Sequence, residues 1–303
     1  MSILNLSVVI CTHNPCRDYL ERVLDALKQQ TLDYTSWELL LIDNASEQLL
    51  SSEIDLSWHP YARHTREEQL GLTPARLRGI KEAQAEIIVF VDDDNVLDAE
   101  YLEAAFHISK DYPLVGAWGG QIEPEFEEEP AEWTKPYWGL LAIRQFEHDH
   151  WSNLLHQHQT TPCGAGLCVR RVVAEKYIEL VSKDSKRLAL DRRGKALTSC
   201  GDSDLAFTAC DIGFGTGQFK ALKLLHLLPS HRTSENYLIK LAEGISYSHT
   251  VLDSLRGKLP NKLSWRMKLL LCYHRFRLSK EQKLMFDAFQ RGKAKAIQEL
   301  LDY

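Results

Sequence analysis

The sequence predicts an α/β protein with a mostly parallel central sheet flanked by helices and with a helical C-terminal extension. In the first third of the chain, short apolar runs rich in β-branched residues alternate with segments of helical apolar spacing. Polar residues follow directly after each apolar run. From about residue 234, the strand pattern gives way to a helical and increasingly basic segment. Strands that are apolar on both faces and alternate with helices are typical of a parallel sheet covered by helices.

Length and composition agree with a globular protein of one large or two ordinary domains. The chain has 303 residues, of which 44% are hydrophobic and 26% charged. No apolar run approaches the ~20 residues that a membrane-spanning helix needs. The N-terminal residues carry no basic region and no cleavage signal, so we expect a mature N-terminus. Seven scattered cysteines without a Cys-x-x-Cys pair indicate a reducing, cytoplasmic compartment.

The elements of the first third are predicted in order along the chain. Residues 6–11 form a buried strand, and residues 17–30 form a helix with apolar positions three and four residues apart. A second strand covers 37–42, and a second helix covers 74–85 with a proline in its first turn. A third strand covers 86–91. Further along, we expect an acidic surface loop at 123–132 and helices at 172–181 and about 204–212.

Polar side chains follow the three predicted strands where each strand ends. Thr12 and Asn14 follow the first, Asp43 and Asn44 the second, and Asp92–Asp94 the third. In open α/β sheets, ligands bind at the carboxyl ends of the strands. We therefore expect these clusters to meet in one crevice.

The three consecutive carboxylates of Asp92, Asp93 and Asp94 are the most informative feature. Adjacent negative charges repel, whereas a divalent cation would offset the repulsion and prefers carboxylate ligands. On a turn after a strand, the first and third side chains can share a face, which is the geometry of a DxD motif. One would hold a sugar hydroxyl and the other a metal on a diphosphate. The alternative is an acidic turn that caps a helix near Asp98.

Six short motifs, in order along about residues 5–235, resemble the family 2 glycosyltransferases, which are inverting enzymes of GT-A (Rossmann-like) fold. Each motif is weak alone, whereas six in family order are specific. The resemblance implies a nucleotide-sugar-binding half at 1–115 and an acceptor-binding half at 116–245, and the basic helical extension expected at 246–303 lies outside the resemblance. The motifs are residues 7–14 (SVVICTHN), 38–46 (ELLLIDNAS), 71–79 (GLTPARLRG), 89–94 (VFVDDD), 164–171 (GAGLCVRR) and 201–205 (GDSDL).

The resemblance also implies roles for residues in binding the donor. Thr12 and Asn14 would line the nucleobase pocket, and Asp43 would contact the base or the ribose. Arg76 would lie near the phosphates. Asp92, with Asp93 beside it, would contact the ribose or the sugar.

A divalent cation, Mn²⁺ or Mg²⁺, is implied as cofactor. Asp94 would ligate it where it bridges the two phosphates, and His226 would complete the site, with His231 as the alternative. Asp202 would be the general base on the acceptor hydroxyl. Many members carry an acidic residue immediately before this base; here the residue is Gly201, and Asp204 is the alternative base.

The function implied is inverting, metal-dependent transfer of a sugar from a nucleoside-diphosphate sugar, with UDP favoured, to a hydroxyl acceptor. The product would be a cell-envelope polysaccharide, glycolipid or glycoconjugate. One carboxylate base suffices for a single displacement, and a cation neutralises the leaving diphosphate. The alternatives are a sugar nucleotidyltransferase and an inactive nucleotide-sugar-binding homologue. Three aromatic residues either stack on a sugar acceptor or pack in the core: Trp133, Tyr137 and Trp138.

The C-terminal extension is strongly basic. Between Arg256 and Lys295 lie twelve basic residues and only two acidic ones, although the whole chain has a net charge of −6. The acidic remainder argues against general nucleic-acid binding. From Trp265 to Phe276, apolar and basic residues interleave. This pattern suits a helix on an anionic membrane, a helix packed on the acidic body, or a solvated basic end. In the first case we expect peripheral contact at the inner face of the membrane.

Overall fold

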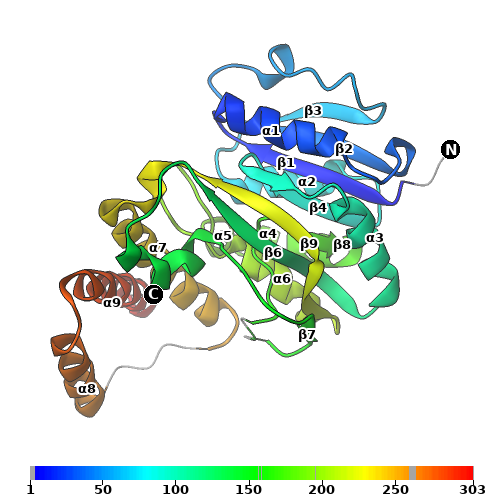
Figure 1. Ribbon diagram of the computed structural model, residues 1–303. Helices are drawn as coiled ribbons and strands as arrows, with labels where there is room; N and C mark the ends of the chain where they lie inside the picture. The colour runs from blue at the N-terminus through cyan, green and yellow to red at the C-terminus, as the bar shows by residue number, and fades with distance from the viewer. Residues whose placement is uncertain (1–3, 156, 158, 195, 259–263, 303) are drawn as a thin grey trace.

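The computed structural model describes residues 4–155, 157, 159–194, 196–258 and 264–302. The first three residues of the expected N-terminus and Lys262 of the basic extension lie outside the described residues. A nine-stranded sheet runs through the molecule in the order β3-β2-β1-β4-β8-β6-β9-β5, and β7 pairs with β9 (Figure 1). Helices flank this sheet, as the sequence predicts.

The first half of the sheet is parallel. Its register pairs Thr12 with Asp43 across β1 and β2, and Cys11 with Asp92 across β1 and β4. The polar strand ends therefore lie side by side at one edge of the sheet. The strands of this half are β1 (Leu6–Thr12), β2 (Trp37–Asn44), β3 (Ala62–Glu67) and β4 (Ile87–Asp92).

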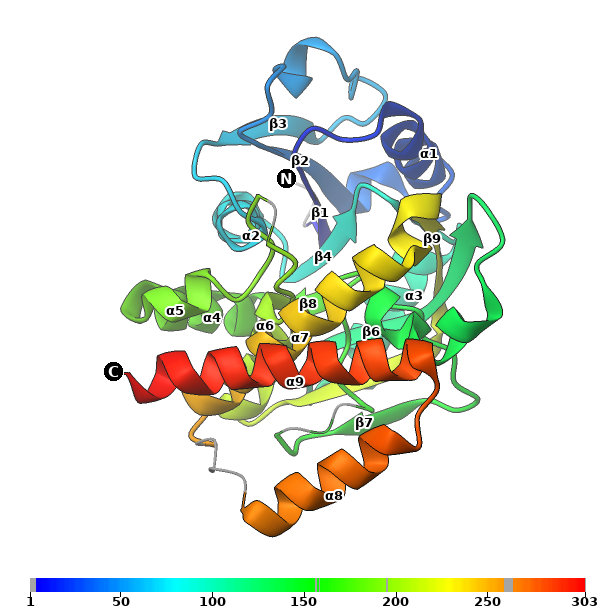
Figure 2. The same cartoon turned by 90° about the vertical axis from the view of Figure 1, so that its left-hand side faces the viewer.

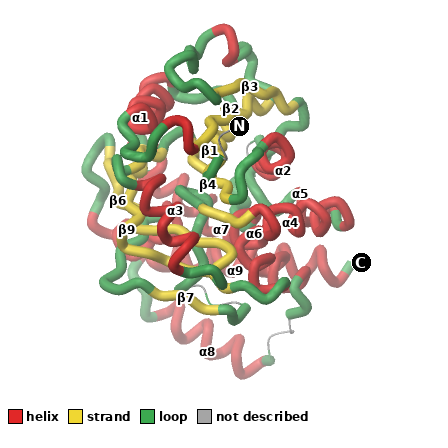
Figure 3. The backbone as a smooth tube through the Cα atoms, turned by 90° about the vertical axis from the view of Figure 1, so that its right-hand side faces the viewer, coloured by secondary structure: helices red, strands yellow, loops and turns green. Residues whose placement is uncertain are grey.

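Helices cover both faces of the sheet because successive side chains of a strand point to opposite faces. Val8 and Ile10 of β1 join the core cluster that contains α1 and α3, whereas Val9 joins the cluster of α2, α4 and α6. Figure 3 shows the two groups of helices on opposite sides of the strands. The helices are α1 (Arg17–Lys28), α2 (Leu72–Glu82), α3 (Tyr101–Asp111), α4 (Arg171–Lys183) and α6 (Gly201–Asp211).

The second half of the sheet is mixed. β8 runs antiparallel to β4 and β6, while β6 and β9 run parallel over most of their length. Two expectations are corrected here. The predicted acidic loop at 123–132 begins inside β6, and the helix expected from Asp204 begins at Gly201. The strands are β5 (Asn95–Leu97), β6 (Val115–Phe126), β7 (His150–Ser152), β8 (Cys168–Arg170) and β9 (Gly215–Leu228).

The C-terminal helices pack on the mixed half of the sheet. Leu238 and Leu241 of α7 share a core cluster with Met285 and Ala288 of α9, and α8 lies to one side (Figure 2). A Cβ at Gly292 of α9 would overlap the carbonyl of Glu243, so this glycine permits the close approach of the two helices. Within the described part of the chain, no helix is long and apolar enough to cross a membrane. The bounds are α7 (Glu235–Leu255), α8 (Trp265–Phe276) and α9 (Lys280–Leu301).

The remaining helices are short: η1 (Tyr34–Ser36), η2 (Leu50–Ser52), η3 (Glu132–Leu141), α5 (Ser185–Leu188) and η4 (Ser230–Thr233). The division at residues 115 and 245 remains a prediction; residue 115 is the first of β6, and residue 245 lies within α7. The aromatic residues of η3 pack against α7 and Phe126, which favours the core interpretation for Trp133, Tyr137 and Trp138.

Candidate active site

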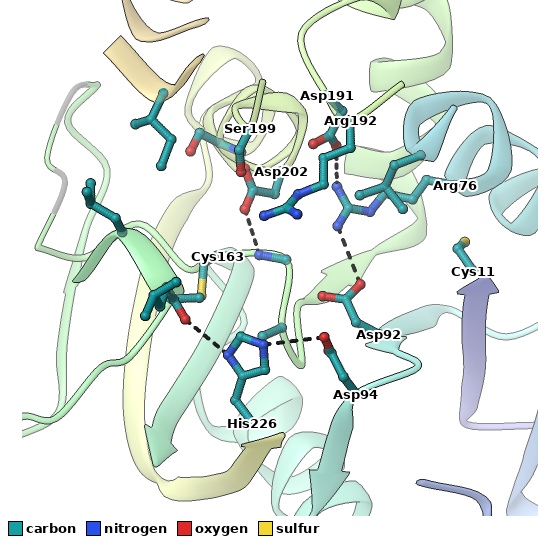
Figure 4. A pocket seen from close by; sticks show the side chains of 18 of the residues that line it. Cys11, Arg76, Asp92, Asp94, Cys163, Asp191, Arg192, Ser199, Asp202 and His226 are labelled. Atoms are coloured by element: carbon teal, nitrogen blue, oxygen red, sulfur yellow. Dashed lines mark hydrogen bonds and ion pairs between the residues drawn. The ribbon is translucent and has the colours of Figure 1, made fainter. Parts of the chain in front are cut away.

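A cavity of about 670 Å³ opens at the carboxyl ends of β1 and β4. Its walls come from α2, η3, η4, α7, β9 and the first turn of α6, and from the loops at 161–165 and 191–199. Figure 4 shows carboxylates and arginines from these separate elements turned toward one another. The cavity brings together most of the predicted site residues, namely Thr12, Arg76, Asp92, Asp93, Asp94, Asp202 and His226.

The three aspartates after β4 face three different partners. Asp92 is 3.9 Å from a guanidinium nitrogen of Arg76, while the Thr12 hydroxyl donates a hydrogen bond to Asp93. Asp94 faces β9 and η4. Burial raises the pKa of Asp92, and burial together with the other two charges raises the pKa of Asp93 to about 7. The turn therefore spreads its mutually repelling carboxylates over three sides of the cavity.

Asp94 has a cationic environment. Its Oδ2 lies 3.5 Å from Nε2 of His226 and accepts a hydrogen bond of 2.8 Å from Arg232. Burial by itself would raise the pKa of Asp94, but these two neighbours outweigh it and hold the pKa well below its usual range. Nδ1 of His226 lies 3.0 Å from the carbonyl oxygen of Leu141, a partner that can only accept. Nε2 is therefore the ring nitrogen turned toward Asp94 and Arg232.

Arg76 forms the opposite wall. It donates a hydrogen bond of 2.7 Å to Asp191, and both side chains are buried. Burial would lower the pKa of Arg76, but Asp191, Asp92 and Asp202 outweigh burial and raise it. A Cβ at Gly164 would overlap the Arg76 guanidinium. The glycine at this position therefore lets the loop at 161–165 approach the arginine.

Asp202 lies in the first turn of α6, half-buried at the cavity wall. Its Oδ2 accepts a hydrogen bond of 2.7 Å from the backbone N–H of Gly164. Its Oδ1 accepts one of 2.7 Å from the N–H of Ser203. Two backbone donors thus fix the carboxylate, and among the residues that the structure describes it forms no ion pair.

The alternative base, Asp204, is fully buried and lies outside the cavity lining. Arg187 and Arg256 donate hydrogen bonds to its carboxylate. Residues two apart in a helix point to roughly opposite sides, about 200° apart, so Asp202 and Asp204 cannot face the same cavity. The alternative metal ligand, His231, also lies outside the lining, against the ring of Tyr237.

The packing around Gly201 explains why no acidic residue stands directly before Asp202. A Cβ at Gly201 would lie 2.5 Å from Oδ2 of Asp191. The carboxylate of Asp191 therefore occupies the space that a side chain at position 201 would fill. Burial raises the pKa of Asp191 to about 6 despite the attraction of Arg76.

Two predicted residues do not line the cavity. Asn14, in the left-handed region at φ 48°, accepts a hydrogen bond from the N–H of Glu47. Asp43 is buried, and its two oxygens accept hydrogen bonds from the N–H of Ser46 and from Arg66. Through these hydrogen bonds, both side chains fix the loop that follows β2.

Sequence reasoning missed Asp191, Arg192 and Arg232, all of which line the cavity. None of them follows a strand of the parallel half. The only signal was the position of Arg232 directly after His231, in the segment already examined for a metal ligand. Asp191 lies in a loop between α5 and α6 that had no recognisable motif.

The sequence profile of glycosyl transferase family 2 matches residues 7–177, more than half of the chain. The chain belongs to glycosyl transferase family 2. The predicted family is thus confirmed. A relative by sequence similarity is the cholesterol galactosyltransferase of Borreliella burgdorferi, 27% identical over 107 residues. These residues are 35% of this chain and 29% of the relative, so the chain spans less than a third of that relative's length.

Solved structures of S. aureus TarS share the fold. TarS 1–349 aligns at a TM-score of 0.51 and 14% identity, over 99% of this chain and 82% of TarS 1–349. The same TarS fragment in complex with UDP-GlcNAc aligns at a TM-score of 0.54 and 14% identity, over 98% and 84%. At such low identity the similarity shows the fold alone, and it confirms the predicted GT-A-like class.

The side chains at Asp94 fit a divalent cation in their chemistry. A carboxylate and an imidazole nitrogen face the same space, and second contacts fix the orientation of the imidazole. Among the described residues, however, no group of three or more His, Cys, Asp or Glu is arranged to hold a metal. Arg232 also donates to Asp94 and lies 3.2 Å from Nε2 of His226. A bound cation would need further ligands from a substrate, and Arg232 would compete with it for both protein ligands.

Proposed function

We propose that the protein transfers a sugar from a nucleoside-diphosphate sugar to an acceptor hydroxyl with inversion at the anomeric carbon. The observation that carries this proposal is the cavity itself. It unites the aspartate turn at the end of β4 with the half-buried Asp202 of α6 and His226 of β9, both of which lie more than 100 residues later in the chain. UDP is the favoured nucleotide, a preference supported by the fold shared with TarS, which was solved with UDP-GlcNAc and with UDP.

The donor would lie along the carboxyl ends of the parallel strands. Thr12 lies at the edge where the nucleobase is expected, with Asn14 on the loop after β1 and Asp43 beside it in β2. The buried cation of Arg76 would attract the diphosphate from one wall. Asp92, whose carboxylate is one-third exposed, is free on one side to accept a hydroxyl hydrogen from the ribose or the sugar.

The leaving diphosphate must have its new negative charge balanced. Asp94 and His226 are the residues that would hold Mn²⁺ or Mg²⁺, and such an ion acts as a Lewis acid on phosphate oxygens when bound. Arg232 lies against the same two side chains and also carries a positive charge. Its displacement from Asp94 would free it to contact a phosphate oxygen.

Asp202 is the proposed general base. Its carboxylate takes the proton of the acceptor hydroxyl while the oxygen forms a bond to the anomeric carbon and the bond from that carbon to the diphosphate breaks. A free hydroxyl has a pKa far above 7, so proton removal during attack is needed. The backbone donors of Gly164 and Ser203 orient the carboxylate, and Asp191 supplies the second carboxylate that other members carry before the base.

The acceptor and the cellular location belong to the same proposal. We place the reaction in cell-envelope polysaccharide, glycolipid or glycoconjugate synthesis. The protein would work in the cytoplasm, at the inner face of a membrane that carries lipid-linked acceptors. The basic C-terminal extension supports such a location because anionic lipids attract clustered Lys and Arg residues.

A donor panel tests the proposal. Purified protein is mixed with UDP-, GDP- and dTDP-sugars with and without Mn²⁺, and both thermal stabilisation and released nucleoside diphosphate are measured. We expect stabilisation by one nucleotide class, since a ligand that binds the folded state raises its stability by mass action. Release of the diphosphate, rather than pyrophosphate from a sugar phosphate and a nucleotide, separates transfer from nucleotidyl transfer. Binding without any turnover, with every acceptor tried, would favour the inactive homologue.

A further inference from the structure

Helix α8 presents an apolar stripe to solvent. Trp265, Leu269, Tyr273 and Phe276 are spaced four, four and three residues apart, so they lie along one side of the helix. Their exposures are 67%, 60%, 63% and 80%. The thiol-bearing Cys272 is exposed as well and lies at the same side by its position in the helical repeat. This stripe (Trp265, Leu269, Cys272, Tyr273 and Phe276) is apolar surface of a kind that soluble helices normally bury.

α8 contacts α9 through two residues near its C-terminal end, whereas Met267 and Leu270, outside the stripe, are themselves 45% and 61% exposed. The ring of His274 lies 5.7 Å from that of Phe286 in α9, and Arg275 forms two hydrogen bonds of 2.7 Å with Asp287. These contacts set the rotation of α8 about its own axis. The stripe is thereby turned away from α9, and Figure 2 shows α8 at the periphery of the molecule.

Arginines border the stripe. The guanidinium of Arg266 lies 5.5 Å from the ring centre of Trp265, and that of Arg277 lies 5.8 Å from the ring centre of Tyr273. Neither arginine has a carboxylate partner among the described residues. If the basic charge of α8 served to hold it on the acidic body, these two arginines would be expected to pair with carboxylates there. They instead extend the charged border of an apolar surface.

We propose that α8 lies flat on a bilayer that contains anionic phospholipids. The stripe enters the boundary between headgroups and acyl chains, where aromatic rings are favoured, and Arg266 and Arg277 contact lipid phosphates. A second copy of the chain fits the surface less well. A symmetric dimer through this face would bring the bordering arginines of the two copies near one another, and like charges would oppose the contact.

We rest this inference on the proposed location at a membrane, and the transfer reaction is separate from it. The stripe is outside the cavity lining, so its substitution leaves the proposed catalytic residues unchanged. Vesicle binding and donor binding can therefore be measured in the same preparation. Absence of vesicle binding with donor binding intact would contradict the membrane inference. Absence of donor binding with vesicle binding intact would contradict the proposed function.

Co-sedimentation with vesicles tests the inference. The full chain is mixed with phosphatidylcholine vesicles and with vesicles in which about a third of the lipid is phosphatidylglycerol. We expect binding to the anionic vesicles, about tenfold or more above that to the neutral ones and weakened by salt. Trp265→Ala/Phe276→Ala should reduce anionic binding about tenfold. Arg266→Gln/Arg277→Gln should remove most of the preference for anionic lipid.

Leu114→Ala is the matched control, because Leu114 is 66% exposed but lies in the loop before β6. Thermal unfolding with and without UDP reports that each variant is folded. Equal sedimentation of wild type and the Trp265→Ala/Phe276→Ala variant would overturn the inference. It would also be overturned if light scattering found a dimer that this double substitution dissociates, since the stripe would then be a protein interface.

Discussion

Two arginines on opposite walls of the cavity each contact two of the proposed functional groups, but they differ in how firmly they are held. Arg76 projects from an eleven-residue helix, its side chain is 5% exposed, and it faces Asp191 and Asp92. Arg232 projects from a four-residue 3₁₀ turn, its side chain is 25% exposed, and it faces Asp94 and His226. Arg76 is therefore a fixed part of the fold, whereas Arg232 can be displaced from its partners.

We infer from this difference that the two walls of the cavity have different functions. A buried cation with several carboxylate neighbours keeps its place through a reaction cycle, because removal of either partner is costly. A cation on a short surface turn can yield its position to a metal or a phosphate. We therefore call the Arg76 side, with Asp191 and Asp202, the permanent wall, and the Arg232 side, with Asp94 and His226, the exchangeable wall.

The largest effect is expected on the permanent wall, from Asp202→Asn. Loss of the proton acceptor should lower the turnover of donor into product about 10³-fold, since general-base catalysis contributes about 10²–10⁴-fold. Donor affinity should change little, because the residues proposed to hold the diphosphate are intact. Steady-state product formation and thermal stabilisation by UDP measure the two quantities. Ser203→Ala, the next residue of the same helix, is the control, and normal turnover in Asp202→Asn would exclude Asp202 as the base.

The next effect separates the two arginines by stability. Arg76→Met leaves the buried Asp191 and the partly exposed Asp92 without their cation, and we expect it to lower the free energy of unfolding by about 3–5 kcal/mol. Arg232→Met should lower it by only about 1–2 kcal/mol, because its turn is partly exposed and His226 still faces Asp94. Denaturant unfolding of both variants checks the ranking. Equal losses would remove the distinction between the two walls.

The strand ends that form the base of the cavity were predictable because their signals are local. Apolar runs that end in polar residues placed Thr12 and Asp92 at one sheet edge, and the parallel register of β1, β2 and β4 brings them together. The choice between Asp202 and Asp204 was left open, since it depends on whether α6 begins at residue 201 or later. A start at Gly201 turns one carboxylate to the cavity and the other to Arg187 and Arg256.

The exchangeable wall and the second carboxylate were harder to foresee because tertiary packing places them. Asp191 lies in a loop and Arg232 in the short turn η4, neither with a recognisable motif, and only the folded chain brings them to the cavity. Asn14 and Asp43 were placed correctly at strand ends, but their side chains make loop hydrogen bonds that no spacing rule encodes. A sequence pattern thus predicts which strand end a residue occupies better than it predicts the direction of the side chain.

A smaller effect concerns pH and the permanent wall. Burial raises the pKa of Asp191 from 3.8 to about 6, so between about pH 4 and pH 6 the folded chain binds more protons at this carboxyl than the unfolded chain does. Its contribution to stability is therefore present at low pH and is lost as the pH rises through about 6. Asp191→Asn should remove this loss of unfolding free energy, which is at most about 1.4 kcal/mol per pH unit.

Asp43 is expected to behave in the opposite way to Asp191. Burial alone would raise the pKa of Asp43, but hydrogen bonds from Ser46, Leu50 and Arg66 lower it. Its contribution is present above its unfolded-state pKa and is lost as the pH falls through the folded value. Unfolding free energies of wild type, Asp191→Asn and Asp43→Asn from pH 3 to pH 7 should therefore show opposite slopes for the two differences. A difference between wild type and Asp191→Asn that is flat from pH 4 to pH 6 would show that Arg76 keeps Asp191 ionised.

The smallest effect tests the exchangeable wall directly. Arg232 donates to Asp94 and lies beside Nε2 of His226, the two side chains proposed to hold the metal. Arg232→Met should therefore tighten Mn²⁺ binding in the absence of nucleotide by about tenfold, because a charge-assisted hydrogen bond of about 1.5–3 kcal/mol no longer competes. Mn²⁺ titration followed by electron paramagnetic resonance measures this, and Arg232→Lys should stay closer to wild type. Asp94→Ala should abolish the binding in either background. If Arg232→Met binds Mn²⁺ no more tightly than wild type, Arg232 is not a competitor of the metal and is as permanent a part of its wall as Arg76.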